Sequence, residues 1–156
     1  MKSLILVRSY HHKNTLKVAE VMAQALEADL VDIQESGPGI ITNYDIIGFG
    51  SGIYWGKFDR DMLALIDKIP SDKNKKVFVF STGGMGSDKF NEFAKELLSK
   101  KEFNVVGSFA CKGFDTFGPF KLVGGINKGH PDDEDLNNAR DFALRIKKMV
   151  QFQVPS

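Results

Sequence analysis

The sequence has one cysteine, Cys111, among its 156 residues. A single cysteine excludes an intramolecular disulfide and any cysteine-rich metal centre, and a chain of this length can bury a core without covalent staples. We therefore expect a cytoplasmic protein. The length is typical of one compact domain, so residues 1–156 are predicted to form a single domain.

Long apolar runs and charge of one sign are also missing. Leu4–Val7 is only four residues long and Arg8 ends it, whereas a membrane-spanning helix needs about 20 apolar residues. We therefore predict neither a signal peptide nor contact with a membrane. The net charge is +1, and the densest basic run, Lys73–Lys76, is predicted to be a solvated turn rather than a nucleic-acid-binding patch.

Short apolar runs alternate with amphipathic segments, which is typical of β-α-β units and a parallel sheet. The predicted strands are Leu4–Val7, Asp29–Ile33, Ile46–Phe49, Val77–Phe80 and Val105–Ala110. Four helices are predicted from the helical spacing of apolar residues, around 16–26, 62–69, 90–98 and 136–150. The expected caps of the second, third and fourth helices are Asp59, Ser87 and Asp132–Asp135. The buried face of the third helix is predicted to hold Phe90, Phe93, Ala94, Leu97 and Leu98.

Two stretches show no helix or strand pattern. Residues 36–43 are too short and too rich in glycine for a full helix, so we predict a loop with a turn. Residues 112–131 form a longer stretch that is rich in glycine and aromatic side chains. Loops of this length are uncommon in compact domains, and this one is too apolar to be simply disordered. We predict that it folds against the domain.

Ligands of open parallel sheets bind beyond the carboxyl ends of the strands, where the winding direction reverses. The segment that leaves the first predicted strand is Ser9-Tyr10-His11-His12-Lys13-Asn14-Thr15. Hydroxyl groups, an amide and free N–H groups at a helix start favour a phosphate dianion. The other interpretation of this segment is a capped helix start with incidental polarity.

The segments after the third and fourth predicted strands are Gly50-Ser51-Gly52-Ile53-Tyr54-Trp55-Gly56 and Ser81-Thr82-Gly83-Gly84-Met85-Gly86. Glycines let a backbone approach a ligand closely, and Trp55, the only tryptophan, suits stacking on a planar ligand. Trp55 as an anchor packed on the domain is the second interpretation. The later segment can offer N–H and hydroxyl groups to the polar edge of a heterocycle, or it can be a tight turn.

Taken in order, these segments resemble the flavodoxin family: a strand, Ser-x-x-x-x-Asn-Thr and a helix, then a glycine-aromatic loop, then Ser-Thr-Gly-Gly. The resemblance covers the chain apart from residues 112–131. It implies a flavodoxin-like three-layer α/β sandwich, with a five-stranded parallel sheet of order 2-1-3-4-5, and it implies FMN as the cofactor. The implied phosphate contacts are Ser9, His11, His12, Lys13, Asn14 and Thr15. The implied contacts of the isoalloxazine ring are Ser51, Gly52, Ile53, Tyr54, Trp55, Gly56, Ser81, Thr82, Gly83, Gly84 and Met85.

The chain departs from the flavodoxin pattern in several ways, one of which is a first segment that is one residue longer, with His11 and His12. Lys13 stands where the family commonly has glycine, the third segment has no tyrosine for the outer face of the flavin, and the charge is near neutral instead of strongly acidic. The first functional hypothesis is an electron carrier with a redox partner protein. The second is an NAD(P)H- or quinone-linked FMN reductase with a small-molecule electron acceptor, and the third is a flavin-free scaffold or signalling module.

The remaining candidate residues are predicted to be structural, and no catalytic residue is assigned. His130 precedes Pro131, which is expected to end the loop. No third carboxylate or histidine joins His130 at a metal-ligand spacing, so no metal site is predicted. Asp132–Asp135 is expected to cap a helix. Cys111 is expected to be a buried strand residue and not a nucleophile.

Overall fold

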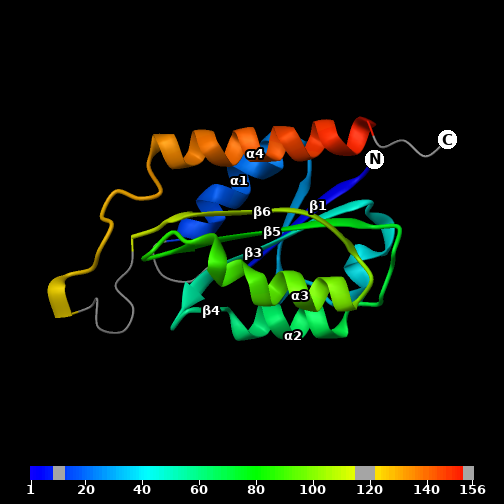
Figure 1. Ribbon diagram of the computed structural model, residues 1–156, viewed down its shortest axis with the longest axis horizontal. Coiled ribbons are helices and arrows are strands. Elements are labelled where there is room, and N and C mark those ends of the chain that lie inside the picture. Colours follow the sequence, from blue (N-terminus) through cyan, green and yellow to red (C-terminus); the bar gives the residue numbers. More distant parts are fainter. Residues whose placement is uncertain (9–12, 115–121, 153–156) are drawn as a thin grey trace.

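The structure is a computed structural model that describes residues 1–8, 13–114 and 122–152. A mainly parallel sheet lies between two layers of helices (Figure 1). The strands are β1 (Ser3–Arg8), β2 (Asp29–Asp32), β3 (Ile46–Tyr54), β4 (Lys57–Phe58), β5 (Lys76–Gly83) and β6 (Asn104–Lys112). The α-helices are α1 (Asn14–Leu26), α2 (Arg60–Lys68), α3 (Glu92–Lys100) and α4 (Asp133–Phe152). Three short 3-10 helices are η1 (Ile33–Glu35), η2 (Pro38–Asn43) and η3 (Asp88–Asn91).

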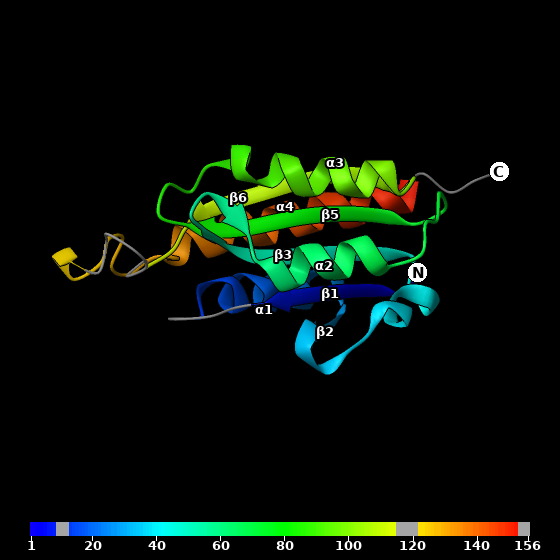
Figure 2. The same cartoon turned by 90° about the horizontal axis from the view of Figure 1, so that it is seen from below.

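The parallel strands have the order β2-β1-β3-β5-β6. When the two-residue strand β4 is set aside, this is the predicted order 2-1-3-4-5, and the flavodoxin-like sandwich is confirmed. β4 pairs antiparallel with the end of β3 and forms a hairpin with it. Helices α1 and α4 cover one face of the sheet and α2 and α3 cover the other (Figures 1 and 2). Because these strands are parallel, their carboxyl ends all lie at the same end of the sheet, which we call the carboxyl edge.

Each face of the sheet has its own apolar core. β1 is buried along its whole length because helices cover both of its sides, which explains its continuous apolar run. Between the sheet and helices α1 and α4, the rings of Phe78 and Phe142 lie 5.7 Å apart and those of Phe78 and Phe80 lie 6.2 Å apart. Burying a side chain of this size stabilises the fold by roughly 1.5–3 kcal/mol.

Two glycines of β3 make room for these rings. A Cβ atom on Gly48 would lie 2.4 Å from Cζ of Phe78, and one on Gly50 would lie 2.2 Å from Cζ of Phe80. Both distances are far shorter than carbon atoms tolerate, so the aromatic rings of β5 occupy the space that side chains on β3 would need. Gly50 therefore belongs to the packing of the sheet and not to a loop.

The central strands are longer than predicted. β3 continues through Tyr54 and β5 through Gly83, because their parallel pairing persists to Ser51 opposite Ser81 and Gly52 opposite Thr82. Gly50, Gly52 and Gly83, which suggested loops, are thus strand residues, whereas Gly56, Gly84 and Gly86 lie outside the strands. In the described residues, no helix has the length and apolar content needed to cross a membrane.

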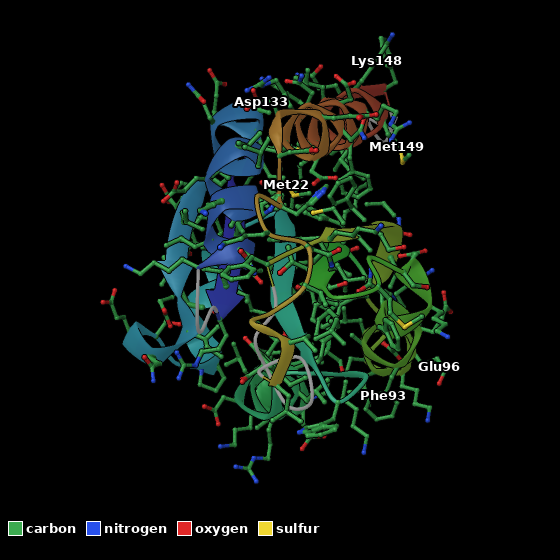
Figure 3. All side chains as sticks on the ribbon, turned by 90° about the vertical axis from the view of Figure 1, so that its left-hand side faces the viewer. Met22, Phe93, Glu96, Asp133, Lys148 and Met149 are labelled. Atoms are coloured by element: carbon green, nitrogen blue, oxygen red, sulfur yellow. The ribbon has the colours of Figure 1, made fainter. Side chains whose placement is uncertain are left out.

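The third predicted helix starts as a 3-10 helix. Ser87 accepts a hydrogen bond from the N–H of Lys89 and so caps η3, after which α3 begins at Glu92. Because a 3-10 helix has three residues per turn, the buried positions become Asn91, Ala94 and Leu98. The prediction that Phe93 is buried is wrong, since 58% of this residue is exposed (Figure 3).

Candidate functional site

Helix α1 starts at the carboxyl edge without the side-chain cap that α2 and α4 have. Its N-cap residue, Lys13, makes no capping bond, and the first turn has no acidic residue. At α2, by contrast, Oδ2 of Asp59 accepts hydrogen bonds from the N–H groups of Asp61 and Met62. Within the described residues, no side chain takes up the first N–H groups of α1. Free N–H groups at a helix start, together with the helix dipole, favour an anion.

Lys13 has a left-handed backbone, with φ 53° and ψ 36°. Glycine adopts this conformation freely, whereas a residue with a Cβ atom loses roughly 1–2 kcal/mol. The position therefore favours glycine for a conformational reason, which accounts for the glycine expected here from the family pattern. In this chain the same position instead brings an exposed ammonium group beside the start of α1.

The first and third predicted segments meet beside this helix start. The hydroxyl oxygens of Thr15 and Thr82 lie 2.8 Å apart and share a hydrogen bond, and both residues are almost fully buried. Nδ2 of Asn14 donates to the carbonyl oxygen of Phe114 at 2.7 Å, which ties α1 to the segment after β6. Oδ1 of Asn14 is buried and has no hydrogen-bond partner among the described residues. A buried acceptor in this state favours a ligand with a donor group.

Trp55 lies at the tip of the β3–β4 hairpin. Trp55 and Gly56 form a two-residue turn in which both have positive φ angles, 53° and 76°, as in the primed turns that connect tight hairpins. Trp55 is 70% exposed. Most of the indole is therefore accessible to a ligand. Next to it, Gly52 makes room for Tyr54, whose Oη would lie 2.5 Å from a Cβ atom on Gly52.

Other predicted site residues use their polar groups within the protein. The buried Oγ of Ser51 donates to the carbonyl oxygen of Gly52 at 2.6 Å and accepts from the N–H of Asp59 at 2.8 Å, so it fixes the hairpin to the start of α2. Ser81 is also buried, whereas Met85 is 65% exposed. Ser9, His11 and His12 lie outside the described residues.

The stretch after β6 is tied to the third segment. The N–H of Gly113 donates to the carbonyl oxygen of Gly83, and Nδ2 of Asn127 donates to the carbonyl oxygen of Gly84 at 2.6 Å. The N–H of Phe114 donates to the carbonyl oxygen of His130 at 2.8 Å, which joins the two ends of the stretch. These hydrogen bonds attach the stretch to the domain, but residues 122–130 project beyond the carboxyl edge (Figure 1) and Leu122 and Val123 are exposed, so this part does not pack against the domain as predicted.

His130 lies beside two carboxylates that the sequence analysis did not connect with it. Its Nδ1 is 2.7 Å from Oδ2 of Asp135 and 3.8 Å from Oδ2 of Asp132, and the three groups place possible ligand atoms within 4.8 Å of one another. The prediction that no third ligand group joins His130 is therefore wrong, because the start of α4 brings Asp132 and Asp135 beside the ring. Each aspartate accepts the backbone N–H of the other, which confirms the predicted capping. The hydrogen bond from the Asp135 N–H is the main reason why the pKa of Asp132 is lowered.

Cys111 and Arg8 are two further residues with reactive or charged side chains near this edge. Cys111 is buried, as predicted, and burial together with the carboxylates of Asp135 and Asp132 raises the pKa of its thiol to about 12. Arg8 ends β1 with a buried side chain, and its Nε lies 3.8 Å from Oδ2 of Asp61. Sequence reasoning missed Arg8, although a basic residue placed directly between an apolar strand and the Ser9–Thr15 segment was a usable signal.

These features define an α/β protein of the flavodoxin-like class whose candidate site lies at the carboxyl ends of its strands. Residues 4–113 match the model of the flavodoxin domain family, and the chain belongs to that family. A protein of Methanocaldococcus jannaschii with no characterized activity is 49% identical over 150 residues, which cover 95% of this chain and 99% of that protein.

Two solved structures have a similar fold. A flavodoxin from the domain Archaea matches with a TM-score of 0.73 and 16% identity, over 97% of this chain and 99% of that one. Flavodoxin 2 from Bacillus cereus matches with a TM-score of 0.73 and 21% identity, over 96% of this chain and 99% of that one.

Proposed function

We propose that this chain binds FMN non-covalently at the carboxyl edge and carries electrons for a partner protein. The start of α1 supports this most directly, since its N–H groups meet no side chain of the described residues and lie beside the Thr15–Thr82 pair. Membership of the flavodoxin domain family supports the same ligand. When bound, FMN supplies the redox chemistry, and the protein supplies binding, orientation and shielding.

Both polar features of the site fit this cofactor. The terminal phosphate of FMN is a dianion for the N–H groups of α1, with Lys13 and Thr15 beside them. The ribityl chain of FMN has hydroxyl groups that can donate to a buried acceptor such as Oδ1 of Asn14. Trp55 offers an exposed flat ring for the isoalloxazine. The hydroxyl of Ser51 is hydrogen-bonded within the protein, so we assign the contact between Ser51 and FMN to the Ser51 backbone.

The test is the visible absorption spectrum of the purified protein, followed by titration of the flavin-free protein with FMN, FAD and riboflavin. We expect FMN to bind most tightly. The first segment offers a site for a terminal phosphate, and no segment of the sequence indicates a pocket for the adenylate of FAD. Binding of FAD with equal or greater affinity, or the absence of flavin binding, would contradict the proposal. The last result would favour a flavin-free scaffold.

The reductase hypothesis makes a separate prediction for the loaded protein. A carrier has no site for a second nucleotide, so it should oxidise NADH or NADPH only slowly when a quinone is the acceptor. The sequence contains no second nucleotide-binding motif, which favours the carrier. Rapid, saturable oxidation of either nucleotide would show that the protein is a reductase.

A further inference from the structure

His130, near the end of the stretch after β6, makes hydrogen bonds to three different residues. Its backbone N–H donates to the carbonyl oxygen of Asn127 at 2.9 Å, and its own carbonyl oxygen accepts from the N–H of Phe114 at 2.8 Å. Its ring nitrogen Nδ1 lies 2.7 Å from Oδ2 of Asp135, which belongs to the first turn of α4. These bonds use both polar groups of the His130 backbone and one nitrogen of its ring, so the residue is fixed on three sides.

The bond to Phe114 continues to the start of α1. The carbonyl oxygen of Phe114 accepts from Nδ2 of Asn14 at 2.7 Å. This bond determines how the Asn14 amide is turned, because only its NH2 group can donate to a carbonyl oxygen. Gly113 leaves room for the amide, since a Cβ atom there would lie 2.7 Å from Nδ2. In this orientation Oδ1 of Asn14 is the buried acceptor that has no partner among the described residues.

The bond to Asn127 continues to the segment after β5. Nδ2 of Asn127 donates to the carbonyl oxygen of Gly84 at 2.6 Å. The backbone of Asn127 is left-handed, with a φ of 57°, which asparagine adopts more readily than most residues. Gly84 belongs to the segment that is predicted to contact the isoalloxazine ring. His130 is thus linked, through one residue on each side, to both the start of α1 and the end of β5.

The contact with Asp135 joins His130 to a helix. Oδ2 of Asp135 also accepts the N–H of Asp132 at 2.9 Å, and Asp132 accepts the N–H of Asp135 in return. The carboxylate that holds the His130 ring is therefore itself fixed by the cap of α4. Figure 3 looks onto the carboxyl edge and shows the stretch crossing this edge from the start of α4, near Asp133. Hydrogen bonds to a carboxylate are stronger than those between neutral groups.

We infer that His130 is a positioning residue for the flavin, which sets the orientation of the Asn14 amide and the place of Gly84 through the residues bonded to it. The inference rests on the proposed function, because these are the segments at which FMN would bind. A binding group that is held in place before the ligand arrives binds more tightly, since less ordering is needed. The acceptor on Asn14 suits a hydroxyl of the ribityl chain, which FMN and riboflavin share. Loss of the His130 ring contact should therefore weaken the binding of both flavins.

Flavin titration of three variants is the first test. His130→Leu removes the ring contact with Asp135 and should weaken the binding of FMN and riboflavin by the same factor, about tenfold. His130→Asn should restore both affinities to within about threefold, because its Nδ2 can donate to Asp135 from near the position of Nδ1. Lys128→Leu is the matched control at an exposed position of the same stretch and should bind both flavins as the unaltered chain does. Unchanged binding by His130→Leu, or equal losses in the leucine and asparagine variants, would overturn the inference.

A second test needs no flavin and separates positioning from general stability. In 1H–15N NMR spectra of the flavin-free protein, His130→Leu should shift the side-chain amide signals of Asn14 and the backbone amide signal of Gly84, and should leave that of Ser3, at the other end of the sheet, unchanged. Shifts throughout the protein, or none at Asn14 and Gly84, would contradict the inference. If the unaltered chain binds no flavin, the proposed function fails, and these spectra still decide whether His130 holds the two segments. If His130→Leu does not fold, Asp135→Asn should weaken the binding of both flavins by about threefold or more, and no loss there would count against the inference.

Discussion

Trp55 occupies a backbone conformation that bulky residues rarely adopt. Its φ of 53° is the first of two positive angles in the hairpin turn, a position that favours asparagine or glycine. Backbone strain of this kind persists where the surrounding structure or a ligand compensates for it. We therefore expect the exposed indole to serve ligand binding.

The Trp55→Asn variant separates the ring from the turn, because asparagine tolerates the left-handed conformation. FMN binding should weaken by about 1–3 kcal/mol, the loss expected when an aromatic ring leaves a flat ligand, while the stability of the flavin-free protein should not fall. In the unaltered protein, FMN should quench the fluorescence of this single tryptophan. Loss of the electron-rich indole should also raise the second-electron reduction potential. If affinity and potential both stay unchanged and quenching is absent, the stacking assignment is wrong.

Lys13 combines a strained backbone with a charge, and two substitutions separate these effects. Lys13→Gly removes both, so the flavin-free protein should gain about 1 kcal/mol in free energy of unfolding. Lys13→Met keeps the strain and removes only the charge. Both variants should bind FMN about threefold more weakly, because a cation near the phosphate is lost, and should bind riboflavin as before. Equal weakening of riboflavin would show that Lys13 acts on loop structure.

At the scale of elements, Gly50 sets how closely β3 and β5 can pack. Gly50→Ala forces a Cβ atom into the ring of Phe80 and should lower the free energy of unfolding by about 1–3 kcal/mol. Gly39→Ala is the matched control, because nothing lies within 4 Å of a Cβ atom there, and its effect should stay within about 0.5 kcal/mol. Urea denaturation measures both. A stable Gly50→Ala protein would show that the sheet can shift to accept the methyl group.

The stretch after β6 can be released by a single substitution. Asn127 has a φ of 57°, so Asn127→Gly keeps the backbone conformation and removes only the side-chain bond to Gly84. Cleavage within residues 122–130 by a dilute protease should become about fivefold faster, corresponding to one hydrogen bond of about 1 kcal/mol. Added FMN should slow cleavage of the unaltered protein. Equal cleavage rates with and without FMN would separate this stretch from the cofactor.

Element order was predictable from the sequence, and element length was not. The continuous apolar runs of β1 and β5 and the Asp59 cap depend on local patterns, so local reasoning identified them. The extension of β3 through Gly50 and Gly52 depends on the rings of Phe80 and Tyr54, which occupy the space beside these glycines. The glycines alone do not indicate such neighbours in the sequence. The 3-10 start before α3 has the same origin, because Asn91 is bonded to the carbonyl oxygen of Phe109 on β6.

At the scale of the whole molecule, the location of the site follows from topology. A parallel sheet with this strand order brings Thr15 and Thr82 to one edge, and the sequence analysis selected both. It missed Arg8 and the carboxylates beside His130. Nor did it show that the Ser51 hydroxyl is hydrogen-bonded within the hairpin and to the start of α2. These features depend on packing between distant segments, which local spacing does not report.

Cys111 gives a measure of the global stability of this arrangement. With its pKa raised to about 12 from 9.0, its thiolate fraction at pH 8 should be about a thousandfold lower than in the unfolded chain. We therefore expect Ellman's reagent to modify the native protein very slowly and the urea-unfolded protein at once. At intermediate urea concentrations, the rate of modification should be proportional to the fraction of molecules that are unfolded. Fast modification of the native protein would contradict both the burial and the protonated state.

The packing of α4 against α1 has a consequence for how the chain is made. One face of the sheet, with Ile5, Phe78 and Phe80, is completed by Ala143, Ile146 and Val150 of α4. When every strand has left the ribosome, α4 is not yet available, so the part of this apolar face that α4 covers is exposed to water. Nascent chains with exposed apolar surface are prone to aggregate. We expect chaperones to bind the chain at this stage of translation and to leave it once α4 emerges.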